Sequence, residues 1–338
     1  MKEGRISGQT WRFQQDIRIL GTGTAVGPHE GKGPLAEDFD IVHDDFYVGQ
    51  DTWEKAERKL FEEAVDVAVQ KSGVDQSMID LMLGGDLLNQ TVSATFTARY
   101  MQRPFLGMFG ACSASMETLA TAAALVDAGF ARYAIAGCSS HNAATEKQYR
   151  YPTEYGGQKK PTAQWTVTGA GAAVIGIGQT GPRVRFATIG KVTDYGLKDP
   201  MDMGSAMAPA AVSTIKAHFQ DTGRKPQDYD LIVTGDLASV GYPIAKKLLQ
   251  EEGYRIEGIY QDCGKMMYAP DQQVFAGGSG CACSACVTYG HILRQMSAGK
   301  LRRVLVVATG ALLSPLTYQQ GESIPCIAHA VSIEQGVD

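Results

Sequence analysis

Asp80-Leu-Met-Leu-Gly-Gly-Asp-Leu87 recurs 150 residues later as Asp230-Leu-Ile-Val-Thr-Gly-Asp-Leu237, with five of its eight positions unchanged. Four residues between 110 and 132 also recur, at an offset of 170 residues, as Gly280, Ala298, Gly299 and Arg302. Each copy is far longer than a solenoid unit of roughly 20–50 residues. The repeat therefore predicts two similar α/β halves, and the change of offset predicts an insertion of about 20 residues within 254–273 of the second copy.

Apolar runs and helical periodicity alternate in both copies and predict the same order of elements twice. The strands are expected at 17–20, 80–86, 104–109, 133–137, 167–175, 184–192, 230–236, 304–309 and 324–333. The helices are expected at 53–70, 93–101, 113–129, 209–222, 243–252 and 281–298. Alternation of this kind predicts mixed sheets covered on both faces by helices.

The segments between these elements predict a turn, a long connection and a domain boundary. The glycine-rich stretch 21–28 is expected to be a turn, and its spacing does not fit a dinucleotide-binding loop. Residues 139–166 form a long irregular stretch, and a connection of that length is more often functional than casual. The boundary is expected at 176–182, which gives halves of 1–178 and 179–338.

Composition limits the classes of function. The 338 residues are 44% hydrophobic and 20% charged, typical of a soluble globular protein with two domains. A net charge of −5 without a basic stripe argues against a nucleic acid partner. No signal sequence and no apolar run of the ~18 residues of a transmembrane helix is expected, so a membrane role would be peripheral. Seven cysteines in apolar stretches predict reduced thiols rather than a disulfide framework.

The two copies differ where each long helix begins, since Cys112 in the first copy corresponds to Ala282 in the second. Cys112 and Ser113 lie between a strand and a helix N-terminus, where backbone N–H groups and the helix dipole favour an anion. Such a position would lower the pKa of the thiol or bind a ligand carboxylate. The alternative is that Cys112 is a small buried residue in a tight turn.

Further polar residues are candidates beside this elbow, each with an ordinary structural alternative. Asp86 and Asp236 end the two repeated strands, and either could cap the next helix instead. Asn89 beside Asp86 is a ligand-binding candidate that leaves a site role open for this part of the chain. His141 after the strand at 133–137 is a further candidate, and the alternative is a loop histidine that is only solvated or hydrogen-bonded.

Cys326 and His329 belong to the closing strand. In a regular strand they would lie on opposite faces, so a turn between them is needed to place both in one pocket. Cys281 and Cys283 point about 160° apart on a helix and cannot share one ion. No metal site and no prosthetic cofactor are therefore predicted.

Duplicated α/β halves with a cysteine at the first elbow resemble the thiolase superfamily, which includes thiolases and ketoacyl synthases. The resemblance implies layers in the order αβαβα, a homodimer, and an acyl-accepting origin for Cys112. The segment that ends at Cys326 looks like the thiolase segment with a second cysteine. The histidine that thiolases carry before the second long helix is missing from 275–281, and the one that ketoacyl synthases carry is missing from 234–239.

This departure bears on activity because condensation needs a base and an imidazole to hold the developing enolate oxygen. Cys112, Cys326 and His329 are then vestiges of a catalytic site, and the resemblance implies that the chain is not an enzyme. A Cys112-dependent acyltransferase and a scaffold with a vestigial pocket remain as alternatives.

Longer segments resemble one family within the superfamily, the stage V sporulation AD family of endospore-forming bacteria. They are 84–90, 109–113, 151–158, 202–209, 270–283 and 308–315. The resemblance implies binding of dipicolinic acid, the pyridine dicarboxylate of spores, during uptake into the developing spore and release at germination. It also implies a peripheral location at the forespore inner membrane, with other stage V channel proteins as partners.

A flat dianion of this kind suits the pocket that the resemblance implies. The two helix N-termini near Cys112 and Ser279 would face its carboxylates. Arg150, Lys159, Lys160 or a bound calcium ion would supply positive charge.

Overall fold

The computed structural model describes residues 5–149 and 159–336. Within them, 13 strands form one sheet whose main path runs β12-β11-β14-β15-β10-β3-β9-β7-β5-β6. The strands of this path are β3 (Ile17–Val26), β5 (Leu81–Gly85), β6 (Phe105–Gly107), β7 (Tyr133–Ser140), β9 (Gly169–Ile177), β10 (Arg183–Thr188), β11 (Leu231–Thr234), β12 (Tyr260–Asp262), β14 (Arg303–Ala311) and β15 (Cys326–Glu334). Three short strands join it at the side, namely β1 (Arg5–Ser7), β2 (Thr10–Arg12) and β4 (Ile41–Val42).

The path repeats itself about its centre, as the internal repeat predicts. Read inwards, β6-β5-β7-β9-β3 has the same order and the same strand directions as β12-β11-β14-β15-β10. In each half the outer three strands are parallel and the inner ones antiparallel. The halves meet where Arg183 of β10 pairs with Arg18 of β3. The duplicated α/β fold predicted from the sequence is therefore confirmed.

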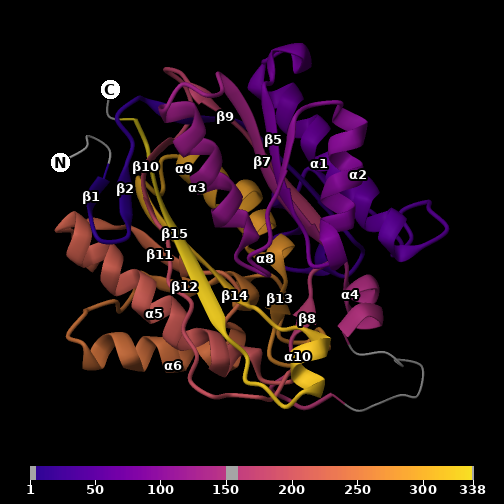
Figure 1. Ribbon diagram of the computed structural model, residues 1–338, viewed down its shortest axis with the longest axis vertical. Helices are drawn as coiled ribbons and strands as arrows, with labels where there is room; N and C mark the ends of the chain where they lie inside the picture. Colours follow the sequence, from indigo (N-terminus) through magenta and orange to yellow (C-terminus); the bar gives the residue numbers. More distant parts are fainter. Residues whose placement is uncertain (1–4, 150–158, 337–338) are drawn as a thin grey trace.

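The two half-sheets form two layers of the molecule. Helices form three more, one outside each half-sheet and one between them (Figure 1). The helices α1 (Trp53–Ser72) and α2 (Val92–Met101) cover the outside of the first half-sheet, and α5 (Met203–Thr222) and α6 (Ala238–Glu251) cover the outside of the second. The helices α3 (Ala114–Asp127) and α8 (Cys281–Cys286) lie between the half-sheets and contact both. A π-helical segment (Val287–Ile292) and α9 (Leu293–Ser297) continue α8 without a break.

Each interface between layers holds a buried apolar cluster. The largest surrounds α3 and α8, and two others lie beneath α1 and beneath α5 and α6. The stretch 21–28 is not the turn expected from its glycines, because β3 runs on to Val26. A Cβ at Gly21 or Gly23 would overlap the backbone of α1, so these glycines let α1 lie directly on the strand.

Several element bounds differ from those predicted. The segment expected to be irregular contains α4 (Asn142–Tyr149), and α5 and α6 begin six and five residues earlier than their prolines suggested. Asp202 caps α5 by accepting from the Ser205 N–H (3.2 Å). In the second half, most of the extra length follows β12, as α7 (Cys263–Met266) and the chain that leads to β13 (Gly278–Ser279).

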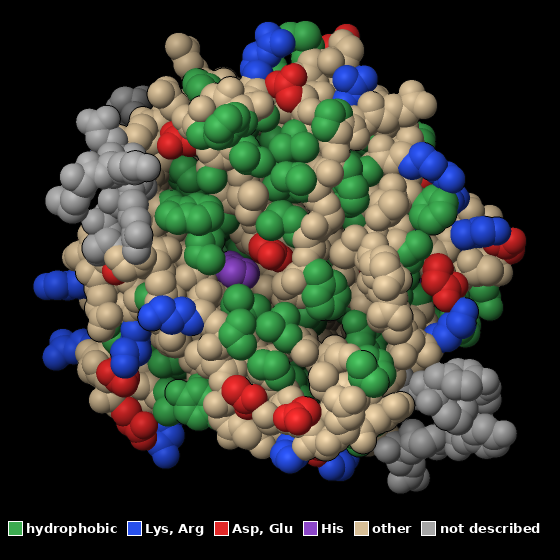
Figure 2. Space-filling view, in the orientation of Figure 1, with side chains coloured by type: hydrophobic (Ala, Val, Ile, Leu, Met, Phe, Trp, Pro, Cys, Tyr) green, Lys and Arg blue, Asp and Glu red, His purple; other side chains and the backbone are tan. Residues whose placement is uncertain are grey.

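The surface has no broad basic area on the face shown in Figure 2, where hydrophobic side chains gather near the centre and charged ones lie mainly towards the rim. Among the described residues, no helix is both long and apolar enough to cross a membrane.

Candidate ligand-binding cleft

A cleft opens between the two halves at the start of α3. The space inside it that is open to the centre of a water-sized sphere is about 50 Å³, so the cleft is narrow. The first half contributes Leu87, Ala111, Cys112, Thr145, Glu146, Tyr149, Gln164 and Thr166, and the second half contributes Pro200, Met201, Met203, Ser279, Ala311 and Leu313. Two short strands hold its upper wall, since β8 (Trp165–Thr166) pairs with β13 so that Thr166 lies opposite Ser279.

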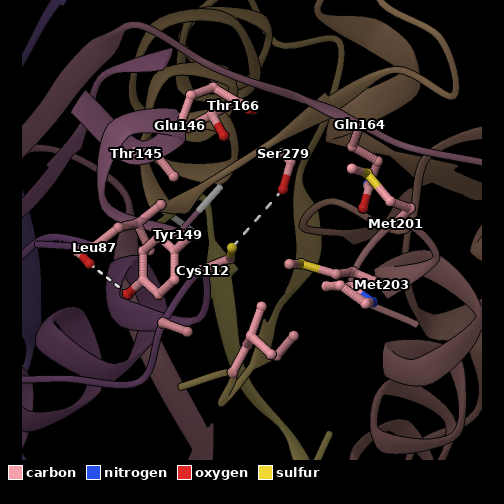
Figure 3. A pocket seen from close by; sticks show the side chains of 14 residues that line it. Leu87, Cys112, Thr145, Glu146, Tyr149, Gln164, Thr166, Met201, Met203 and Ser279 are labelled. Carbon is pink, nitrogen blue, oxygen red and sulfur yellow. Dashed lines mark hydrogen bonds between the residues drawn. The ribbon is translucent and has the colours of Figure 1, made fainter. Parts of the chain in front are cut away.

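The floor of the cleft is a chain of hydrogen-bonded groups that begins with the contact between Cys112 and Ser279 drawn in Figure 3. The Cys112 Sγ lies 4.0 Å from the Ser279 Oγ, which donates to the Asp236 Oδ2 at 3.1 Å. The same carboxylate oxygen accepts from the Gly280 N–H at 3.1 Å, and Oδ1 accepts from the Thr309 hydroxyl at 2.6 Å. Burial raises the pKa of Asp236 to about 6, although these donors oppose the shift. Asp236 is therefore a buried carboxyl group one side chain away from the ligand space.

Cys112 is not activated by this setting. Burial raises the pKa of its thiol well above the ordinary value, and the Asp236 carboxylate raises it further. The expectation that the helix N-terminus would lower this pKa is wrong, because loss of hydration outweighs the helix dipole for a thiol that is 6% exposed. Ala111 just before it has φ +50°, a left-handed backbone that a non-glycine residue adopts at a cost.

The side walls carry polar atoms with different degrees of satisfaction. The Tyr149 hydroxyl donates to the Leu87 carbonyl at 2.6 Å. The Gln164 Nε2 donates to the Asp236 and Gly278 carbonyl oxygens, which fixes the orientation of the amide. Its Oε1 and the Thr145 Oγ1 are buried and have no hydrogen-bond partner among the described residues. Both residues line the cleft, so these two atoms have unused hydrogen-bonding capacity beside it.

Positive charge is scarce around the cleft. Among the described residues that line it, only Glu146 carries a charge, and the Lys159 Nζ pairs with its Oε1 at 2.8 Å. Lys160 pairs with Asp199 instead. Arg150, the third basic candidate from the sequence, lies outside the described residues.

The first-half candidates other than Cys112 do not line the cleft. Ser113 donates its hydroxyl to the Gly110 carbonyl (2.6 Å), and Asp86 accepts from two backbone N–H groups of its own half. Asn89 is exposed on the outer surface beside α4. His141 is buried, where its Nε2 meets the Phe46 carbonyl at 2.7 Å and its Nδ1 accepts from the first N–H groups of α4. Burial lowers the pKa of His141, which leaves the ring neutral.

Cys326 and His329 lie in β15 behind the cleft. The Cys326 Sγ contacts the Ile324 carbonyl (3.5 Å), and burial raises the pKa of its thiol to about 12. The His329 Nδ1 accepts from the Gly190 N–H (3.3 Å), and burial lowers its pKa to about 4. The strand is regular through both residues, so the turn that would bring them into one pocket is absent from this described segment.

Of the eight ligand-binding candidates, only Cys112 and Ser279 meet in the cleft. Residues that the sequence did not single out form most of its walls, including Tyr149, Gln164 and Met201. One signal pointed to them, because five lining residues come from the long stretch expected to be functional on its length. Cys281 and Cys283 donate to different carbonyl groups, those of Ser139 and Gly235, and no cluster of three metal-ligating side chains occurs in the part of the chain described.

Five alternating layers with a cysteine at the first elbow define the thiolase-like class of protein. Solved structures agree: 3-oxoacyl-[acyl-carrier-protein] synthase III from Aquifex aeolicus VF5 matches with a TM-score of 0.58 and 13% identity over 94% of this chain and all of that one. OleA from Xanthomonas campestris matches with a TM-score of 0.61 and 15% identity over 97% and 100%. At these identities the likeness concerns the fold.

The sequence places the chain more narrowly. The family model for Stage V sporulation protein AD matches residues 7–334. Stage V sporulation protein AD of Bacillus subtilis (strain 168) is 58% identical over 327 residues, which cover 97% of both chains. The chain belongs to the stage V sporulation protein AD family, as its longer segments predicted.

Proposed function

We propose that this sporulation protein binds dipicolinic acid, or its calcium complex, in the cleft and carries out no chemistry on it. The observation that carries the proposal is the floor of the cleft, where a buried neutral thiol faces Ser279 and no histidine is among the described lining residues. Acyl transfer needs a thiolate and a base close to it. Binding needs neither, so loss of both is expected in a binder.

The shape of the cleft suits a flat, rigid ligand. Tyr149 lies on one side of Cys112, and Met201 and Met203 lie on the other (Figure 3). Aromatic and thioether side chains pack well on the faces of a pyridine ring. The polar atoms of Gln164, Thr145 and Ser279 lie around this apolar slot and would orient the ligand by its edge.

The charge of a dianion is the feature that the lining residues match least. Among the described lining residues Glu146 is the one that carries a charge, and Lys159 is connected to the cleft through its ion pair with Glu146. A calcium ion chelated by the ligand would remove this mismatch, because calcium prefers carboxylate and amide oxygens such as those of Glu146 and Gln164. We therefore propose calcium as a counter-ion that arrives with the ligand rather than as a resident cofactor.

Calorimetry with dipicolinic acid, with and without calcium, tests the proposal. A saturable one-to-one isotherm is expected, and Cys112→Trp should weaken it at least tenfold because the indole fills the floor. Phe130→Trp is the matched control, since Phe130 is 81% exposed and lies outside the cleft. Normal binding by Cys112→Trp would place the site elsewhere, and the absence of binding in both conditions would refute the proposal.

The same sample distinguishes the two alternatives. Transfer of an acyl group from acyl-CoA to Cys112, detected as a mass increase that Cys112→Ser abolishes, would favour an acyltransferase. No ligand and no acyl transfer would favour a scaffold.

We further propose that the chain forms a homodimer through the edge of the first half-sheet. Among the described strands, β6 pairs only with β5, and Leu106 and Phe109 at this edge are 46% and 48% exposed. An unpaired apolar edge is a surface that another strand can cover. Sedimentation should show a dimer that Leu106→Lys weakens, and a monomer at micromolar concentration would contradict the idea.

The cellular setting is also a proposal, which the family supports. The protein would act peripherally at the forespore inner membrane, with other stage V channel proteins, in uptake of the ligand and its release at germination. Fractionation of sporulating cells should recover it with forespore membranes, and salt should release it. Recovery only in the soluble fraction would count against this location.

A further inference from the structure

We propose that a ligand carboxylate bound in the cleft is coupled to the uptake of one proton by Asp236. The inference rests on the proposed function and concerns the regulation of the same site. The proton comes from solvent and resides on the Asp236 carboxyl group while the ligand is bound. The negative charge of the ligand is then compensated at the floor of the cleft without a basic residue.

The inference follows from the single proton of the Ser279 hydroxyl. In this structure the proton is donated to the Asp236 Oδ2 at 3.1 Å. A hydroxyl donates only one hydrogen bond, so Ser279 cannot donate to Asp236 and to a ligand carboxylate at once. If Ser279 turns to the ligand, its oxygen and the Asp236 carboxylate face each other without a proton between them. A proton on Oδ2 restores the chain, in which Asp236 donates to Ser279 and Ser279 donates to the ligand.

The groups around Asp236 favour this proton when an anion is bound. From the first half, the Cys112 thiol faces the carboxyl group. From the second half, Asp262 after β12 and the thiols of Cys263 and Cys283 lie close to it, and Cys326 of β15 is within electrostatic range. Burial keeps the thiols neutral, and the Asp262 carboxyl group disfavours a second negative charge.

The remaining contacts of Asp236 stabilise it in either form. Thr309 donates to the other carboxylate oxygen, Oδ1, and Gly280 donates its N–H. On the ligand side, the charged lining residue Glu146 is paired with Lys159 (2.8 Å), so this pair offers an anion no net positive charge. With the pKa of Asp236 near 6, about a tenth of the molecules hold this proton at pH 7 even before a ligand binds.

Calorimetry measures the proton directly. Metal-free dipicolinate is titrated into the full chain at pH 7.5, with a chelator present, in buffers that differ in their enthalpy of ionisation. The observed heat should vary linearly with that enthalpy, with a slope close to one proton taken up. The dissociation constant should rise about tenfold for each pH unit between 7 and 8.5.

Two variants test whether Asp236 holds the proton that is taken up. Asp236→Asn cannot take up a proton, so its binding should be independent of pH and its heat independent of buffer; an amide nitrogen that donates to Ser279 in place of Oδ2 gives up the hydrogen bond from the Gly280 N–H. Ser279→Ala removes the relay and should also lose the proton uptake. Asp86→Asn is the matched control, because Asp86 occupies the equivalent position in the first copy, is equally buried and does not line the cleft. It should retain the uptake of the parent protein.

The outcomes separate this inference from the proposed function. Saturable binding with a buffer-independent heat and a constant affinity between pH 7 and 8.5 would overturn the coupling alone. Proton uptake that persists unchanged in Asp236→Asn would also overturn it, because another group would then hold the proton. The absence of any dipicolinate binding would overturn both, since no ligand would be present to drive the uptake.

Discussion

Glu30 provides a quantitative test of how the two halves are held together. It is fully buried, and its Oε1 accepts from the Thr168 N–H (3.0 Å) and from the Tyr268 hydroxyl. Tyr268 belongs to the segment that follows α7, so this glutamate joins the first half to the inserted part of the second. Its Oε2 is buried without a hydrogen-bond partner among the described residues. Burial raises the pKa of Glu30 to about 7, against the effect of its two donors.

The pKa sets the direction and size of the expected effect. A carboxyl group with a raised pKa holds its proton more tightly in the folded chain, so its contribution is complete below pH 4.5 and is lost as pH rises through 7. The difference between the ordinary pKa of 4.5 and the folded-state pKa of about 7 corresponds to about 3 kcal/mol of unfolding free energy. Glu30→Gln cannot ionise, and its amide oxygen can accept the same two hydrogen bonds. The variant should match the parent near pH 4.5 and exceed its stability by about 3 kcal/mol at pH 8.5.

Urea unfolding of both proteins at several pH values measures this difference. Glu37→Gln is the matched control, because Glu37 is exposed and its substitution should change the unfolding free energy little at any pH. The pH dependence has other contributors, so the difference between parent and variant is the decisive quantity. A difference that stays constant from pH 4.5 to 8.5 would refute the reasoning, and so would a variant less stable than the parent at pH 8.5.

Two further predictions concern the elbow cysteine and the first strand. Iodoacetamide at pH 7.5 should label Cys112 at least tenfold more slowly in the folded chain than in the chain unfolded by urea, because burial and Asp236 disfavour its thiolate. Peptide mass spectrometry locates the label. Faster labelling of Cys112 in the folded chain would show that it is an activated nucleophile. Gly23→Ala should lower the unfolding free energy by about 1–3 kcal/mol, because its Cβ would overlap the Ala64 carbonyl oxygen of α1. Gly178→Ala is its control, because the Cβ there meets two side chains, Leu20 at 3.0 Å and Arg18 at 3.9 Å, and no backbone atom within 4 Å. Equal effects of the two substitutions in urea unfolding would show that the contact with α1 does not matter.

The fold could be predicted because short segments of sequence show the strand and helix patterns that define it. Strand and helix patterns repeat at a fixed offset, and a repeat of that length has few architectures available. Predictions from glycine and proline positions were wrong where tertiary packing determines the backbone conformation. Gly21 and Gly23 look like a turn, but they lie in a strand because α1 packs against their bare backbone. Pro209 and Pro243 look like helix starts, but both lie inside helices that begin earlier.

The site could be predicted only in part, since most of its walls come together through the fold. Cys112 was identifiable because the second copy has alanine at the matching place, and Ser279 because it lies just before the second long helix. Nothing in the sequence separates Gln164 or Met203 from other residues of their types. Both reach the cleft because β8 pairs with β13 and because α5 begins at the mouth. His141 and His329 attracted attention by residue type, yet burial and backbone contacts explain both.

The two repeated aspartates show how the copies diverged in role while keeping the same motif. In the first copy, Asp86 accepts from the N–H of Leu88 and of Ala94, so its carboxylate is used within its own half. In the second copy, the N–H equivalent to that of Leu88 belongs to Ala238, and it donates to Asp262 instead (2.9 Å).

Asp262 ends β12 and also accepts from the N–H groups of Leu237 and Lys265, so it performs the local capping role in the second half. Asp236 is thereby available to the Ser279 and Thr309 hydroxyls at the floor of the cleft. Asp86 and Asp236 occupy equivalent positions in the two copies, which suggested a shared capping role. Their hydrogen-bond partners nevertheless differ. If this exchange of partners is what places Asp236 beside the ligand, the proton uptake proposed above requires Asp262 as well as Asp236. Asp262→Asn should then alter the pH range of the uptake as well as the stability of the second half.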